Sequence, residues 1–96
     1  MDVYNEDNQP SNTKDNNQDI IRSVRDRSIE ALVPLLDELE DTPERKFGIV
    51  LTAVRSIDKP ELLEKALNYA QQIEDKTEKA QALIDIANEA TVRLQS

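Results

Sequence analysis

Two stretches of the chain, 34 positions apart, share nearly the same pattern. Residues 39–53 read LEDTPERKFGIVLTA, and residues 73–87 read IEDKTEKAQALIDIA. Each has an apolar residue followed by Glu-Asp, a two-residue gap, a Glu next to a basic residue, and then apolar residues at helical spacing. Because charge, size and apolar phase survive the shift together, we interpret the two stretches as copies of one helical unit.

Apolar residues recur at steps of three and four from residue 19 onward, which predicts an all-α fold. We expect four to five helices arranged as two stacked helical hairpins, with the first helix capping them. A simple up-down helical bundle is the alternative. The expected helices cover residues 19–29, 31–40, 43–56, 60–73 and 77–94.

Prolines mark three of the expected boundaries. Pro34 removes an amide hydrogen and crowds the preceding turn, so the chain should kink or break there. Thr42 and Asp58 are expected to cap the helices that open at Pro43 and Pro60, where a missing amide costs nothing.

The apolar spacing also predicts which side of each helix is buried. Helix 43–56 is apolar on most sides, so we expect it to be central. The expected inward residues of helix 60–73 are Leu63, Ala66, Leu67, Ala70 and Ile73. Those of helix 77–94 are Ala80, Leu83, Ile84, Ala87 and Ala90.

The first 18 residues differ in composition from the rest. They are rich in Asn and Gln and hold few bulky apolar side chains. Such a segment buries too little surface to offset its conformational entropy, so we predict a disordered polar tail at 1–18 and a helical domain at 19–96.

Composition argues against most catalytic and cofactor chemistry. The chain has no His, no Cys and a single Gly, which removes the commonest general base, thiolate chemistry and any glycine-rich phosphate loop. We therefore expect no enzyme activity, no cofactor and no metal. The formal charge of −8 disfavours nucleic acid and anionic membranes as partners. With no apparent secretory signal, a cytoplasmic location is the simplest expectation.

The 34-residue helix–turn–helix spacing resembles the tetratricopeptide repeat. The units would be 29–62 and 63–96. The matching positions in the second unit are Ala66, Tyr69, Ala70, Ile73, Ala82 and Ile86; in the first they are Leu32, Leu35, Leu36, Leu39, Gly48, Thr52 and Pro60. The pattern is similar to the short helical repeats of some bacterial proteins, cyanobacterial ones among them.

The resemblance also has consequences for individual positions. It places the small residues Gly48 and Ala82 where the two helices of a unit approach closely. It is degenerate, because the large aromatic of the family is missing, Leu36 fills a small-residue slot, and Arg55 and Glu89 stand where a second small residue is usual.

In the tetratricopeptide family, the first helix of each unit lines a concave surface that holds partner peptides. Here the corresponding stripes each read acidic, apolar, polar, acidic, at steps of three and four. They would suit a basic, partly apolar segment of a protein partner; the alternative is that the apolar residues are ordinary core and the carboxylates a solvated face. The candidate partner-binding residues are Glu30, Val33, Asp37, Glu40, Glu64, Leu67, Gln71 and Glu74.

Two units leave open apolar ends, because repeat arrays usually need about three units to be stable alone. The last expected helix, 77–94, is therefore a candidate for self-association as a homodimer, around Ile86, Ala90 and Leu94. The sequence thus favours a protein–protein interaction module or adaptor. The alternative is a small acidic inhibitor that mimics nucleic acid on a basic target surface.

Overall fold

The computed structural model describes residues 10–95 and confirms the all-α prediction. Its elements are α1 (Pro10–Leu32), the 3₁₀ helix η1 (Val33–Glu38), α2 (Pro43–Ser56), α3 (Glu61–Gln72) and α4 (Lys76–Leu94). The chain divides into two compact units, Met1–Leu32 and Val33–Ser96, which we call unit 1 and unit 2. None of the described helices combines the length and the apolar character that crossing a membrane requires.

Unit 1 holds α1, which starts nine residues earlier than predicted. The expected tail is therefore helical from Pro10 onward, while residues 1–9 lie outside the described part. Proline at the first helical position loses no hydrogen bond, and extending an existing helix requires no new nucleus. The predicted unit 29–62 and domain 19–96 both cross the boundary between the two units.

Pro34 breaks the α-helix as predicted, but α1 runs to Leu32 and the expected helix 31–40 is instead the shorter 3₁₀ helix η1. With three residues per turn, Val33 and Leu36 lie on the same side of η1. Both are buried, and Leu36 has no exposed surface at all. The break thus directs two apolar side chains into the core of unit 2.

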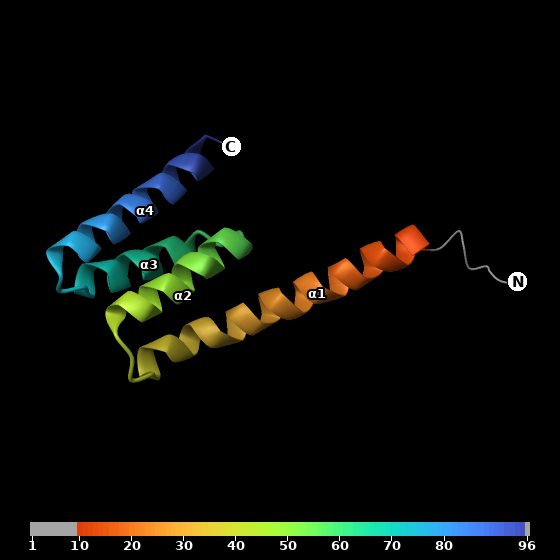
Figure 1. Cartoon of the computed structure of the whole chain (residues 1–96), viewed down its shortest axis with the longest axis horizontal. Helices are drawn as coiled ribbons and strands as arrows, with labels where there is room; N and C mark the ends of the chain where they lie inside the picture. The colour runs from red at the N-terminus through yellow and green to blue at the C-terminus, as the bar shows by residue number, and fades with distance from the viewer. Residues whose placement is uncertain (1–9, 96) are drawn as a thin grey trace, which may run out of the picture. The chain divides into compact units, whose positions relative to one another are not determined.

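In unit 2, α2, α3 and α4 run in alternating directions, each next to the one before it (Figure 1). α2 starts as predicted, because the Thr42 hydroxyl accepts a hydrogen bond from the amide of Arg45 at 3.2 Å and Pro43 follows it. The prediction that α2 is central is wrong, because α3 lies between α2 and α4 and packs against both. α2 nevertheless contributes five core residues: Phe47, Val50, Leu51, Ala53 and Val54.

The start of α3 differs from the prediction, since Asp58 does not cap it. The N-cap position is Pro60, which has no side-chain cap. The amides of Leu62 and Leu63 instead bond the carbonyls of Lys59 and Pro60, both at 3.0 Å. The amides of Leu62 and Leu63, which a capping Asp58 carboxylate would otherwise bind, are therefore already hydrogen-bonded within these turns. α3 buries Leu62, Ala66, Tyr69 and Ala70, with Ile73 buried just after it.

The predicted inward face of α4 is wrong. Ala82 is its only fully buried residue among those described, and the half-buried positions around it include Ile86, Glu89 and Arg93. Of the predicted stripe, only Ala90 is half-buried. The others are exposed: Ala80, Leu83, Ile84 and Ala87.

Gly48 also differs from its predicted role at a close helix contact. It is exposed, and a Cβ added there would meet nothing within 4 Å. Its φ is not positive, so an L-residue fits without strain. We therefore expect Gly48→Ala to raise the free energy of unfolding by about 0.5–1 kcal/mol, because glycine is a poor residue for a helix interior.

Urea denaturation followed by circular dichroism measures this change. A loss of stability in Gly48→Ala would contradict the expectation. It would show that another backbone passes close to residue 48 in solution, as the tetratricopeptide-like pairing predicts.

Candidate functional site

Three hollows on unit 2 are candidates for a site. The first, which we call the Arg93 pocket, has a volume of about 460 Å³ and lies at the end of α2 beside α4. The second, the α3–α4 groove, has a volume of about 440 Å³. The third, the acidic hollow, is smaller at about 210 Å³ and lies between α2 and α4.

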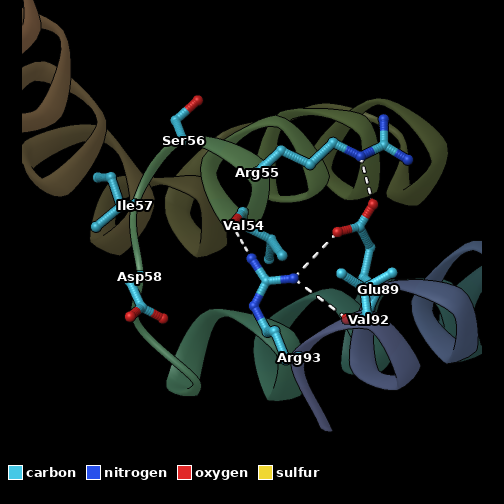
Figure 2. A pocket seen from close by; sticks show the side chains of 8 residues that line it. All are labelled: Val54, Arg55, Ser56, Ile57, Asp58, Glu89, Val92 and Arg93. Atoms are coloured by element: carbon cyan, nitrogen blue, oxygen red, sulfur yellow. Dashed lines mark hydrogen bonds and ion pairs between the residues drawn. The ribbon is translucent and has the colours of Figure 1, made fainter. Parts of the chain in front are cut away.

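The Arg93 pocket is lined by a polar network that joins α4 to α2. The Arg93 guanidinium donates to the backbone carbonyl of Val54 and to the Glu89 carboxylate, the latter at 3.1 Å. Arg55 donates to the same carboxylate at 2.7 Å (Figure 2). The hydrogen bond from Arg55, and then that from Arg93, holds the pKa of Glu89 below its usual value. 

The geometry of this network gives Arg93 a structural role. The last carbonyls of a helix lack partners within the helix, and cations are favourable at that end. Ile57 follows α2 in an extended conformation and donates to the Ala53 carbonyl, while Arg93 occupies the carbonyl of Val54. Figure 2 shows the guanidinium between that carbonyl and Glu89. Arg93 therefore acts as a C-cap supplied by a neighbouring helix.

A second polar network fixes η1 against α3. The Tyr69 hydroxyl donates to one carboxylate oxygen of Asp37, and Lys65 donates to the other at 2.9 Å. The hydrogen bond from Tyr69, and then that from Lys65, lowers the pKa of Asp37. Burial, followed by the hydrogen bond to Asp37, raises the pKa of Tyr69 to about 12. Lys65 and Lys46 also lie within 6 Å of the Tyr69 ring centre, at 5.6 and 5.8 Å.

The raised pKa of Tyr69 predicts a loss of stability in alkali. The folded state holds the proton more tightly than the unfolded state, whose tyrosine titrates near 10. This contribution is therefore complete below pH 10 and is lost as pH rises through 12, by an amount on the order of 1–2 kcal/mol. Denaturation of Tyr69→Phe over the same range should lack that component, although both proteins share the titration of their lysines. Parallel curves for the two proteins would contradict the assignment.

The α3–α4 groove combines apolar and acidic side chains. Its apolar side chains include Leu63 and Leu67 on α3 and Ile86 on α4, all half-buried. The carboxylates of Glu61 and Glu64 border it, and both residues are exposed. Pro60 completes the described lining, which includes no cation.

The acidic hollow is lined by three carboxylates, those of Glu44, Glu78 and Asp85. They lie next to Phe47 and Ile73. No set of three or more His, Cys, Asp or Glu side chains within the described residues is arranged to hold a metal ion. The hollow therefore offers a negative surface and no coordination site.

The structure distributes the predicted partner-binding residues over several places. Glu30 belongs to unit 1, whereas Val33 is buried in unit 2 and Asp37 bonds Tyr69, so the first stripe does not lie on one α-helical face. The change to 3₁₀ geometry after Leu32 is the reason. Glu40 is exposed after η1.

More of the second stripe lies on a single surface than of the first. Glu64 and Leu67 both line the α3–α4 groove, while Gln71 and Glu74 are exposed beyond it. Of the residues predicted for self-association, Ile86 lies in that groove, Ala90 is half-buried and Leu94 is 86% exposed. The groove thus unites two predicted partner-binding residues with one predicted for self-association.

Sequence reasoning missed the Arg93 cap and the Tyr69–Asp37 pair. Both join residues more than 30 positions apart, so no local pattern reveals them. One signal was available: Arg55 and Glu89 are equivalent positions of the repeat predicted from the sequence, have opposite charge, and do form an ion pair. Comparisons with protein-family models, curated proteins and solved structures found no match for this chain.

Proposed function

We propose that this chain is a non-catalytic protein–protein interaction module that holds a basic, partly apolar segment of its partner in the α3–α4 groove. The observation that carries the proposal is the lining of that groove. Leucine and isoleucine side chains lie beside two exposed glutamates, and no cation lies among the described lining residues.

The apolar part of the groove suits the side chains of an amphipathic helix. Such helices bind through apolar residues spaced by three or four positions, which enter a groove between two helices of the receptor. The volume of about 440 Å³ holds only a few side chains. The affinity would then depend on one or two apolar anchors, and Leu67 and Ile86 would contact them from opposite walls.

The charge of the groove determines which segments would bind. Glu61 and Glu64 border it, and the whole chain carries a formal charge of −8. Complementary charge accelerates encounter and selects among partners. A lysine- or arginine-rich segment is therefore favoured over a neutral or acidic one. Glu64 and Leu67, which the tetratricopeptide resemblance predicts as partner-binding residues, both line this groove.

Fluorescence anisotropy with labelled peptides tests the proposal. The probes are a set of helical peptides with leucines spaced by four positions and flanking lysines, together with versions in which glutamate replaces lysine. We expect the basic set to bind more tightly. Leu67→Ala should weaken binding about tenfold, the loss expected for one apolar contact.

Matched charge variants separate the groove from the general acidity of the chain. The double variant Glu61→Lys with Glu64→Lys should abolish binding of the basic set. Glu38→Lys with Glu40→Lys, both exposed and outside the groove, changes the net charge equally and should retain most of it. Equal losses in both double variants would contradict the groove proposal.

Salt dependence distinguishes the alternative, an acidic inhibitor that mimics nucleic acid. Binding by mimicry would fall steeply with salt and would be insensitive to Leu67→Ala, because it depends on long-range charge. Binding anchored in the groove should tolerate salt and lose affinity in that variant. The two functions therefore predict opposite outcomes in one pair of titrations.

A further inference from the structure

The outer face of α4 presents an uncovered apolar stripe. Leu83 is 36% exposed, Ile84 51% and Leu94 86%. Ala80, Ala87 and Thr91 are exposed between them. Because two helical turns take about seven residues, positions 80, 87 and 94 lie almost in line, and the other three flank that line. We call these six residues the α4 stripe.

The α4 stripe carries no charge, although a third of the chain is charged. The charged residues in the second half of α4 point elsewhere, since Glu89 and Arg93 contact α2 and Asp85 borders the acidic hollow. Two molecules with a formal charge of −8 repel each other on most surfaces. The stripe is a surface on which two copies can meet without opposing carboxylates.

We propose that the α4 stripe is a self-association surface that pairs with the same stripe of a second copy, antiparallel, about a two-fold axis at Ala87. In such a pairing, positions equally distant from residue 87 face each other. Leu94 of one copy then lies opposite Ala80 of the other, and Leu83 lies opposite Thr91.

The sizes of the paired residues support this symmetry. Large side chains lie opposite smaller ones on both sides of the axis, and the small Ala87 meets itself at the centre. Small residues at the crossing point let two helices approach closely, and alternating sizes allow interdigitation. An unrelated partner would need to supply the same neutral pattern of large and small residues, whereas a second copy carries that pattern because it has the same sequence.

The extent of the stripe limits the affinity. The segment that carries it, 15 residues from Ala80 to Leu94, spans about 21 Å at 1.5 Å per residue, so the stripe is one helix face and smaller than a standard interface. The expected dimer is therefore weak, with a Kd between about 10 µM and 1 mM. The stripe shares no residue with the α3–α4 groove, so the two surfaces can be tested separately.

Sedimentation equilibrium of the full chain from about 10 µM to about 1 mM tests the proposal. The wild type should shift from monomer to dimer over that range. Ala87→Glu should remain monomeric, because two carboxylates would meet on the axis. Asn88→Glu changes the charge equally at an exposed neighbour and should still dimerise. A wild type that stays monomeric, or a dimer that survives Ala87→Glu, overturns the proposal.

Two further measurements test the symmetry itself. Ala87→Lys alone should be monomeric, but mixed with Ala87→Glu it should form a heterodimer, because the two substituted residues face each other. Because the chain has no cysteine, Ala87→Cys provides a single thiol that should oxidise to a disulfide-linked dimer at least about tenfold faster than Asn88→Cys. Equal oxidation rates, or no heterodimer, would rule out an axis at Ala87.

Discussion

Replacing Leu36 with alanine is expected to lower the free energy of unfolding of unit 2 by about 2–4 kcal/mol. Leu36 is fully buried and lies in η1. Truncation removes apolar contacts and leaves a cavity that the neighbouring helices fill only in part. In a unit of this size the loss corresponds to a fall in Tm of about 10 °C or more. Urea denaturation and thermal unfolding, both followed by circular dichroism, measure it.

Leu35 provides a matched control for this variant. It precedes Leu36 in the same 3₁₀ helix but is 51% exposed, so Leu35→Ala should cost less than about 1 kcal/mol. The pair also tests the family resemblance, in which position 36 is a slot for a small residue. If Leu36→Ala were as mild as Leu35→Ala, that slot would be real and the packing of η1 on unit 2 would be wrong.

Local chemistry made several parts of the fold predictable. Thr42 followed by Pro43 specifies a helix start on its own, and α2 begins there. Pro34 cannot occupy a helix interior, and the α-helix ends before it. Both predictions depend only on neighbouring residues, so they needed no knowledge of the tertiary structure.

The orientation of α4 could not be predicted in the same way. The helix has apolar residues on two sides: Ala82, Ile86 and Ala90 on one, and the α4 stripe on the other. Periodicity alone favours the richer side. In the structure the side with Ala82, Ile86 and Ala90 packs against the rest of unit 2, because Glu89 and Arg93 next to it find partners on α2. Such partners compensate the burial of polar groups and are visible only in three dimensions.

The candidate site was predictable only in part for the same reason. Glu64 and Leu67 follow the helical spacing of α3 and reach the groove. Val33 and Asp37 do not, because the 3₁₀ break rotates the chain and the Tyr69 hydroxyl binds Asp37. The interpretation of the two stretches as copies of one unit therefore predicted equivalent surfaces, but Pro34 lies in only one of the predicted units and gives that part of the chain a different geometry.

Replacing Arg93 with methionine is the second large effect that we expect, a loss of about 1.5–3 kcal/mol in the free energy of unfolding. Methionine keeps an unbranched stem over the same surface but removes the guanidinium. The carbonyl of Val54 then loses its partner at the end of α2, and Glu89 loses one of its two cations. Lysine restores the charge but, as a compact ammonium, not the fork that bonds both groups, so Arg93→Lys should recover less than half of the loss.

Arg55→Met is the control that separates capping from ion pairing. Arg55 contacts the same carboxylate at 2.7 Å, but its side chain is 55% exposed. Exposed pairs contribute little, so this variant should cost less than about 1 kcal/mol at neutral pH.

The two ion pairs of Glu89 also make stability depend on pH. Because the pKa of Glu89 is lowered in the folded state, the stabilisation from these ion pairs is present above about pH 4.5 and is lost as the carboxylate is protonated. The Val54 contact does not titrate there, so part of the Arg93→Met effect should persist in acid. If it disappeared together with the Arg55→Met effect, Arg93 would act only through Glu89, and α4 would not cap α2.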